Sequence, residues 1–222
     1  MMFSFSSSSA EPGGFGKMNA AYWYSFCMGT LCKDGASAEL SGSTDEAEEG
    51  HAEGVEVAFD VSSGWGIGGV GAPDEETYIG AAIRVVSEDG EPTFSEILNW
   101  TKGVCFVLSA NAPVWLKIGL DPYKMWDMEL NTPKIQLVAP GSASLGSLIV
   151  NCKSWDEFKQ EEPIVGDTIS GREAFEQMES LIFEVMTSEK DHGIIRIYDI
   201  FEYGSDYNMK VDGMDVYIGS ND

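Results

Sequence analysis

The chain has 222 residues, of which 13 are lysine or arginine and 37 are aspartate or glutamate, giving a formal net charge of −24. A charge this negative repels phosphate backbones and anionic lipid headgroups, so the composition argues against nucleic acids and membrane surfaces as partners. No run of apolar residues reaches the roughly 18 that a membrane-spanning helix needs. The length fits one β-sandwich domain with additions and is sufficient to bury a hydrophobic core.

The start of the chain is rich in serine and glycine, which predicts a flexible segment over residues 1–16. This segment contains no lysine or arginine, so it lacks the charged start of a signal peptide. We expect either a chain trimmed from a longer secreted protein or a cytosolic protein. The main domain is expected over residues 17–204. Residues 205–222 are acidic and turn-rich, which predicts a tail, a linker to another module, or a last strand at 214–218.

Most of the domain consists of short segments in which apolar and polar residues alternate, the pattern of half-buried β-strands. Residues 18–32 predict an aromatic strand and a turn, whereas residues 33–54 predict a polar loop. A glycine-rich loop, SSGWGIGGVGAPDEE, lacks the GK[ST] of a phosphate-binding loop and has no helix after it. Further strands are expected near residues 55–61, 78–85, 104–108, 114–120, 134–138, 147–152, 181–187 and 193–203.

Two of these strands flank a short Asn-Ala-Pro turn at residues 111–113. Alternating strands on either side of a tight turn are typical of a hairpin, so residues 104–108 and 114–120 are predicted to pair with each other. The segment that follows, residues 122–132, is predicted to be a loop beside the sheet edge.

One short helix is predicted over residues 171–179, because Ser170 and Glu173 have the spacing of a capping box. Trp100 and Trp155 each follow a turn and flank a strand, so both are predicted to anchor the core. Many short strands with one short helix indicate an all-β fold. The prediction is a two-sheet antiparallel β-sandwich of jelly-roll, galactose-binding-like type.

Four cysteines are present, at Cys27, Cys32, Cys105 and Cys152. There is no CxxC, and neither histidine is close to a cysteine in sequence, so the spacing does not indicate a metal site. Four cysteines allow three disulfide connectivities. We favour Cys27–Cys32 across a tight turn and Cys105–Cys152 between strands, and four reduced thiols are the alternative.

In a strand, the residues between the apolar positions lie on the opposite face of the sheet. These positions combine aromatic rings with charged and amide groups, and they are Glu56, Asp60, Tyr78, Arg84, Trp115, Lys117, Gln136, Glu184, Arg196 and Tyr198. A sugar ring can stack its C–H face on an aromatic ring and hydrogen-bond its hydroxyls to carboxylates, amides and guanidinium groups. The pattern therefore predicts a concave sheet that binds an extended glucan, and an ordinary solvent-exposed face is the alternative.

Each residue of the predicted ligand-binding set has an expected role. Trp115 and Tyr198 are predicted to stack on sugar rings, because a large aromatic ring is costly to expose to water. Hydrogen bonds to hydroxyls are predicted for Arg84, Asp60, Gln136 and Arg196, and Tyr78 and Lys117 complete the set. A shift of one residue in strand register would exchange the two faces.

The sequence gives little indication of catalysis. Neither His51 nor His192 has a nucleophile partner in sequence, and the motifs GxSxG and HEXXH are absent. With 37 acidic residues, some carboxylate pair will have the spacing of a glycosidase by chance. The chain is therefore predicted not to be an enzyme. A structural or interaction module without sugar affinity is the second hypothesis, and a glycan-active enzyme is the third.

Several segments resemble one known family. The run ILNWTKGVCFVLSANAPVWLKIGLD is similar to two successive strands of the family 11 carbohydrate-binding modules and related jelly-roll modules of bacterial plant-fibre degraders. The segments NCKSWDEFKQ, GDTISGREAFEQMESLIFEV and IRIYDIFEYG resemble later segments of the same modules. The resemblance covers roughly residues 77–204. The sequence departs from the family at Leu108, where tyrosine is common, and in lacking an acidic opening segment.

The resemblance implies a concave carbohydrate cleft for plant cell-wall polysaccharide, secretion, and frequent attachment to a glycoside hydrolase domain. It also implies the Cys105–Cys152 disulfide, because related modules have cysteines at corresponding places. No cofactor is expected apart from a structural calcium ion, for which Asp199 is the remaining candidate ligand.

Overall fold

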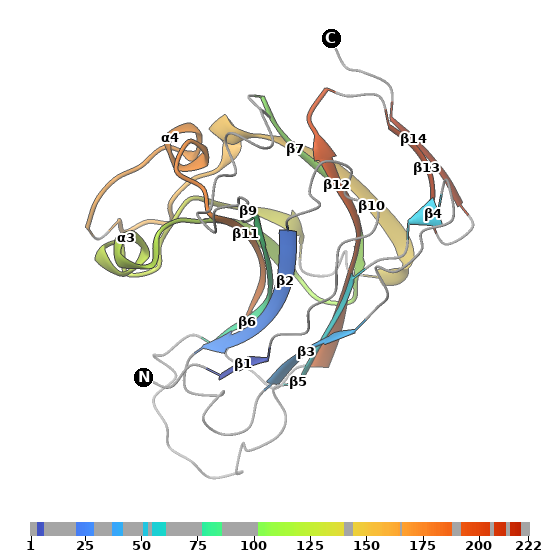
Figure 1. The fold of residues 1–222 in the computed structure, drawn as a ribbon, viewed down its shortest axis with the longest axis horizontal. Helices are drawn as coiled ribbons and strands as arrows, with labels where there is room; N and C mark the ends of the chain where they lie inside the picture. Colours follow the sequence, from blue (N-terminus) through green and yellow to red (C-terminus); the bar gives the residue numbers. More distant parts are fainter. Residues whose placement is uncertain are drawn as a thin grey trace.

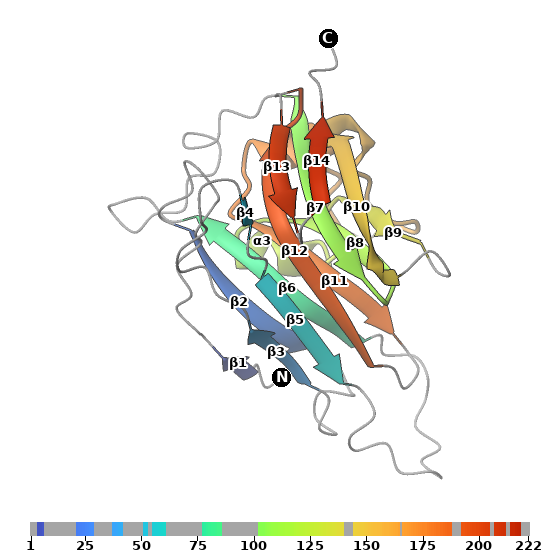
Figure 2. The ribbon, with the colours of Figure 1, turned by 90° about the vertical axis from the view of Figure 1, so that its right-hand side faces the viewer.

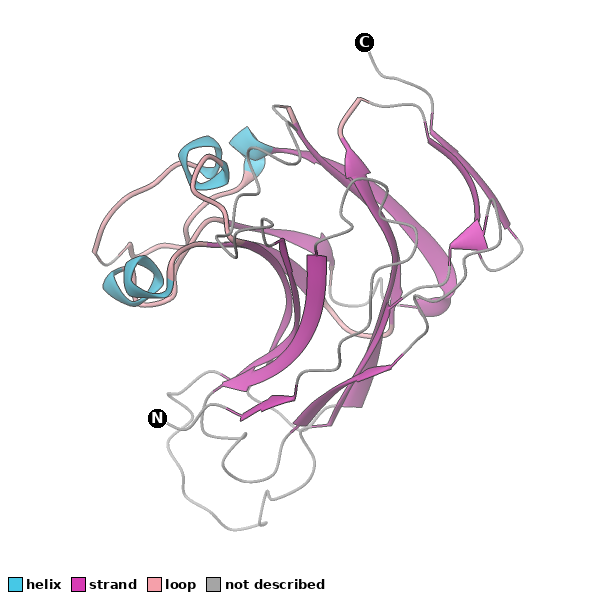
Figure 3. Ribbon diagram, in the orientation of Figure 1, coloured by secondary structure: helices cyan, strands magenta, loops and turns pink. Residues whose placement is uncertain are grey.

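The computed structural model describes residues 4–6, 21–28, 37–41, 51–52, 55–60, 77–85, 102–139, 144–164, 166–187, 192–204, 207–211 and 214–218. Two antiparallel sheets pack face to face and enclose the main core (Figures 1 and 3). The predicted two-sheet antiparallel β-sandwich of jelly-roll type is confirmed. Within the described residues no helix is both long enough and apolar enough to cross a membrane.

The first sheet, sheet A, has six strands. Its spatial order is β1 (Ser4–Ser6), β2 (Ala21–Met28), β6 (Thr77–Val85), β11 (Ser180–Thr187), β8 (Val114–Gly119) and β9 (Lys134–Val138). The second sheet, sheet B, has five strands. Its spatial order is β10 (Ser144–Ser154), β7 (Gly103–Ala110), β12 (His192–Glu202), β5 (Val55–Asp60) and β3 (Ser37–Ser41).

A third, smaller sheet, sheet C, lies against the outer face of sheet B (Figure 2). It contains β14 (Met214–Ile218), β13 (Tyr207–Val211) and β4 (His51–Ala52), and β4 pairs with β13 in parallel. Val216 on β14 is buried in a small cluster with Val107 and Tyr198 of sheet B. Of the alternatives for the end of the chain, the structure therefore shows the last strand, together with a partner strand that the sequence did not predict.

The main core lies between sheets A and B. Strands β7 and β8 contribute alternate residues to it, as expected for strands with one face inward. These core residues are Val104, Phe106, Leu108, Val114, Leu116 and Ile118. Phe106 of sheet B meets Phe183 of sheet A edge to face, with ring centroids 6.5 Å apart. The rings thus join the two sheets across the middle of the sandwich.

The predicted hairpin of residues 104–108 and 114–120 is wrong. Strand β7 pairs with β10 and β12 in sheet B, whereas β8 pairs with β9 and β11 in sheet A. The short turn between them therefore crosses from one sheet to the other. Asn111 in this turn accepts a hydrogen bond from the backbone N–H of Ile194 at 2.7 Å, which ties the crossover to sheet B. Two consecutive alternating strands fit either arrangement, because both bury their apolar faces.

Two short α-helices and one 3-10 helix are found in the described residues, and they lie close together (Figure 3). They are α3 (Pro122–Asp127), η1 (Trp155–Glu157) and α4 (Gly171–Phe175). The first corrects the prediction of a loop over residues 122–132. Asp121 is its N-cap and accepts hydrogen bonds from the backbone N–H groups of Tyr123 and Lys124, while Pro122 occupies the first turn.

The other two helices begin with complete capping boxes, as predicted for Ser170 and Glu173 at the start of α4. Trp155 of η1 is fully buried and stacks on Phe175 of α4 with ring centroids 4.4 Å apart. The prediction that Trp155 anchors the core is confirmed, whereas Trp100 lies outside the described residues. These rings hold η1 and α4 together.

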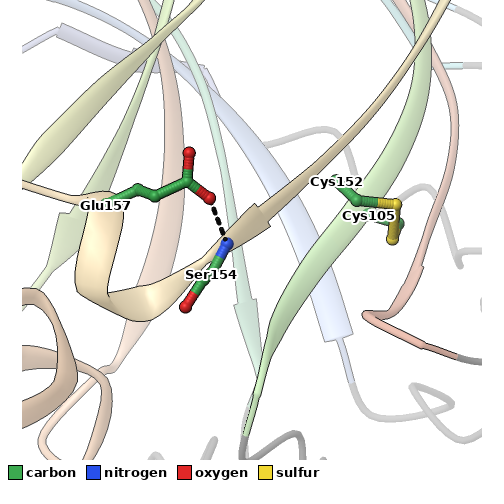
Figure 4. Close-up of a disulfide and its surroundings, with 4 residues drawn as sticks. All are labelled: Cys105, Cys152, Ser154 and Glu157. Atoms are coloured by element: carbon green, nitrogen blue, oxygen red, sulfur yellow. Dashed lines mark hydrogen bonds between the residues drawn. A yellow bond between two sulfur atoms is a disulfide. The ribbon is translucent and has the colours of Figure 1, made fainter. Parts of the chain in front are cut away.

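The predicted disulfide between Cys105 and Cys152 is confirmed (Figure 4). The two cysteines are directly opposite each other on β7 and β10. Just beyond the disulfide, the backbone N–H of Ser154 donates to the Glu157 carboxylate at 2.8 Å, which closes the capping box of η1 (Figure 4). The predicted Cys27–Cys32 disulfide lies outside the described side chains.

The N-terminal third differs from the prediction in one respect. Residues 33–54 were expected to be a loop, but Ser37–Ser41 pairs with β5 and His51–Ala52 pairs with β13. These two segments are polar and show little alternation of apolar residues, so their sequence does not indicate strands. They form strands because the backbones of the partner strands provide hydrogen bonds for them. Within the predicted flexible segment of residues 1–16, the structure describes Ser4–Ser6, as strand β1.

Candidate binding face

The predicted ligand-binding residues are divided between the two sheets. Tyr78, Arg84, Trp115, Lys117 and Gln136 belong to sheet A, and Asp60, Arg196 and Tyr198 belong to sheet B. The outer faces of two packed sheets point in opposite directions. The prediction that one surface carries the whole set is therefore wrong, because alternation within a strand does not say to which sheet the strand belongs.

The outer face of sheet B does not offer Tyr198 for stacking. Its side chain is only 5% exposed and is packed with Val107 and with Val216 of sheet C. Its hydroxyl lies 3.4 Å from the Ser109 hydroxyl. The prediction that Tyr198 stacks on a sugar is corrected, because sheet C covers this part of sheet B.

Two further residues of the predicted set lie on sheet B. Arg196 donates a 2.6 Å hydrogen bond to Glu56 in an ion pair, and this bond raises the pKa of the guanidinium above its usual value. The side chain of Asp60 lies outside those that the structure describes. Its backbone is paired with His192 at the end of β12.

Asp199 is buried beside Tyr198, where β12 has a bulge opposite Val107. Its carboxylate accepts a hydrogen bond from the backbone N–H of Ile200 at 2.8 Å. A calcium ion needs about six to eight oxygen ligands. Among the described residues, no group of three or more acidic, histidine or cysteine side chains is placed to hold a metal ion, and a structural calcium ion at Asp199 stays a prediction.

The outer face of sheet A collects the other predicted residues in rows that cross the strands. Residues directly opposite each other on neighbouring antiparallel strands share a face. In one row, Trp115 lies between Gln136 of β9 and Glu184 of β11. In the next row, Lys117 lies between Lys134 of β9 and Ile182 of β11.

The same rows continue toward the other edge of sheet A. Arg84 is opposite Tyr22 of β2, and Tyr78 is opposite Met28. Tyr24 is opposite Ala82, which in turn is opposite Ile182. The backbone register thus assigns these two tyrosine positions of β2, and those of Tyr78 and Arg84, to the face that carries Trp115. Strands β2, β6 and β11 are bent, and their hollow side is turned away from sheet B (Figure 1).

Four charged side chains form two ion pairs on this face. Lys117 Nζ lies 3.8 Å from Glu184 Oε1, and both side chains are almost completely buried, with exposed fractions of 5% and 1%. Lys134 Nζ lies 2.5 Å from Glu161 Oε2 and 5.2 Å from the centroid of the Trp115 ring. Two lysines opposite each other would repel, so each having its own carboxylate stabilises the arrangement.

A pocket of about 200 Å³ opens over the β8–β9 end of this face. Lys117 and Lys134 form its floor. Its walls are two segments, residues 129–131 after α3 and residues 161–163 after η1. Asn131 joins the walls, because its side chain donates to the Glu161 carbonyl at 2.8 Å and accepts from the Glu161 N–H at 2.9 Å.

The sequence reasoning missed two of these residues, Lys134 and Glu161. Lys134 could have been found, because it is two residues from Gln136 in the same predicted strand and so shares its face. Glu161 comes from a segment without periodicity, and its position depends on backbone hydrogen bonds between Lys134 and Lys159. Glu184 was part of the predicted outward face and is found there.

Comparisons with solved structures find family 11 carbohydrate-binding modules. The module from Clostridium thermocellum in complex with a β-1,3-1,4-mixed-linked tetrasaccharide is 13% identical, with a TM-score of 0.42, and the match covers 81% of this chain and 90% of that one. The module of the cellulosomal cellulase Lic26A-Cel5E of Clostridium thermocellum is 12% identical, with a TM-score of 0.43 and coverage of 89% and 95%. A solution structure of CtCBM11 is 14% identical, with a TM-score of 0.44 and coverage of 80% and 86%. No family model and no curated protein matches the sequence.

Proposed function

We propose that this chain is a non-catalytic carbohydrate-binding module that holds a plant cell-wall polysaccharide of the β-glucan type on the outer face of sheet A. One observation carries the proposal. The register of sheet A brings an indole ring, an amide and buried charged groups together on one bent face, in rows that cross the strands. A glucan lying across those strands would meet a ring for stacking and polar groups for its hydroxyls.

We further propose that the protein is extracellular and acts beside a glycoside hydrolase domain, and two observations support the extracellular setting and a neutral ligand. The Cys105–Cys152 disulfide is of the kind that persists in oxidising compartments. A net charge of −24 leaves an uncharged polysaccharide as a more suitable ligand than a polyanion.

Affinity electrophoresis through gels that contain mixed-linkage glucan, xyloglucan or mannan tests the proposal. We expect retardation on at least one of these glucans. Replacing Trp115 with alanine should weaken binding by about 1–3 kcal/mol, or roughly 5- to 150-fold, because one stacked ring is lost. Tyr217→Ala is the matched control, since Tyr217 is 72% exposed on sheet C, and it should bind like the unaltered chain. Unretarded migration on all three glucans would refute the proposal.

One observation favours a structural or interaction module without sugar affinity. Ser180 and Ile182, together with the Lys117–Glu184 pair, are buried on the outer face of sheet A. A module of this kind would migrate unretarded on every glucan, and Trp115→Ala would change its stability without changing its mobility in the glucan gels.

A further inference from the structure

The pocket lies at one edge of sheet A, where the binding face ends. Strand β9 is the last strand of the sheet. Beyond it, the backbones of Lys134 and Lys159 exchange hydrogen bonds at 2.9 and 3.1 Å, so the next segment runs alongside the edge. That segment leads into residues 161–163, which form one wall of the pocket. The face is therefore bounded at β9 by walls on both sides of the Lys117–Lys134 floor.

The walls are held firmly in place. Asn131 binds the backbone of Glu161 through both of its side-chain groups. Gln160 donates to the Asn131 carbonyl at 3.0 Å and to the Asp167 carbonyl at 3.0 Å, and it accepts from the N–H of Ile169 at 2.9 Å. These bonds fix the two wall segments relative to each other. The walls can therefore block a ligand from extending past this end of the face.

The pocket suits one uncharged sugar unit. The pocket volume of about 200 Å³ is below the roughly 300–1,000 Å³ of pockets for drug-sized ligands, so its size suits one sugar unit better than several. Two lysines and three glutamates line it, so the lining has no excess of positive charge that would select an acidic sugar. Its floor is continuous with Trp115 through the contact of the Lys134 ammonium with the indole ring.

We infer that the module binds its polysaccharide at a chain end, with the terminal neutral sugar unit in this pocket and the following units on the face beside Trp115. This inference rests on the proposed function and adds to it the part of the polymer that is recognised. A glucan that crosses the strands toward β9 meets the walls, and a chain that ends there fills the pocket.

Titration calorimetry separates end binding from binding along the chain. The probes are linear mixed-linkage glucan of two average lengths, and a cyclic β-glucan, which has no ends. End binding predicts one protein per linear chain at both lengths and at least tenfold weaker binding to the cyclic glucan. A protein-to-chain ratio that rises with chain length, or equal affinity for the cyclic glucan, would overturn the inference while leaving the proposed function intact. Absence of heat with every glucan, together with unretarded migration in the gels, would overturn both.

A substitution that fills the pocket provides a second test. Glu162 is exposed on the pocket wall, and Glu162→Trp should weaken binding of a short linear glucan at least tenfold. Glu176 is exposed at the end of α4 outside the pocket, so Glu176→Trp is the matched control and should bind normally. Thermal unfolding of both variants verifies that they fold. Unchanged affinity of a folded Glu162→Trp protein would contradict a sugar unit in the pocket.

Discussion

The buried Lys117–Glu184 pair provides the sharpest test of the electrostatics of sheet A. Both side chains are at least 95% buried, and their charged atoms are 3.8 Å apart. Replacing Lys117 with methionine keeps most of the side-chain volume but leaves the Glu184 carboxylate buried without the neighbouring ammonium. Breaking a buried pair in this way typically destabilises by about 3–5 kcal/mol. For a chain of this size, each kcal/mol lowers the melting temperature by roughly 2–4 °C, so the expected loss is about 6–20 °C.

The double variant Lys117→Met/Glu184→Leu completes the cycle. Replacing a buried ion pair with apolar residues of similar volume is often neutral or stabilising. We expect the double variant to recover most of the stability that Lys117→Met loses, which corresponds to a coupling free energy of about 3 kcal/mol or more, above the range of 0.5–3 kcal/mol usual for residues in contact. Urea unfolding of the unaltered chain, Lys117→Met, Glu184→Leu and the double variant, followed by tryptophan fluorescence, measures this free energy.

The cycle also distinguishes stability from binding. The folded double variant should bind glucan more weakly than the unaltered chain, because Lys117 lines the pocket and its ammonium is gone. A melting temperature for Lys117→Met within 2 °C of the unaltered chain, equivalent to about 1 kcal/mol or less, would refute the reasoning. It would mean that water reaches the carboxylate and that the pair is not buried in solution.

Two further predictions concern the scaffold. The Cys105–Cys152 bridge spans 47 residues, so its double replacement by alanine should lower the free energy of unfolding by about 4 kcal/mol in urea titrations, and a loss below 1 kcal/mol would contradict that value. Hydrogen bonds from Arg172 hold the pKa of Asp156 below its usual value of 3.8, so the stabilisation is present above that pH and is lost as the pH falls through the lowered pKa. Asp156→Asn should therefore lower the melting temperature at neutral pH but not in strong acid, whereas equal losses at both pH values would show that charge is not the cause.

Residue periodicity was sufficient to predict the strands that have one apolar face. Strands β5, β6, β8, β9, β11 and β12 were all expected close to their observed bounds. The capping box at Ser170 was equally informative, because it depends on local geometry alone. The N-terminal signal of α3 was present as Asp121 followed by Pro122, but a helix with no buried residue has no apolar periodicity to support it.

Periodicity could not assign strands to sheets. Strands β7 and β8 both alternate, and only the long-range pairing with β10, β11 and β12 separates them. The same ambiguity placed Trp115 and Tyr198 on one surface, although the sandwich puts them on opposite sides. The walls of the pocket were also beyond prediction, because side-chain amides of Asn131 and Gln160 hold them and such contacts leave no repeating pattern.

The contrast between the two outer faces bears on where a ligand binds. On sheet B, Tyr198 is covered by Val216 of sheet C. Burial of apolar surface in this contact stabilises the packing of sheet C on sheet B. On the outer face of sheet A, Lys117 and Glu184 are buried to a similar extent as Tyr198, but they carry an ammonium and a carboxylate. Desolvating these two charges costs more than packing apolar side chains of similar volume, so their presence is not explained by stability. These groups can donate to and accept from hydroxyls, and they lie beside an indole ring and a pocket, which supports the proposal that a polar ligand binds on sheet A rather than on sheet B.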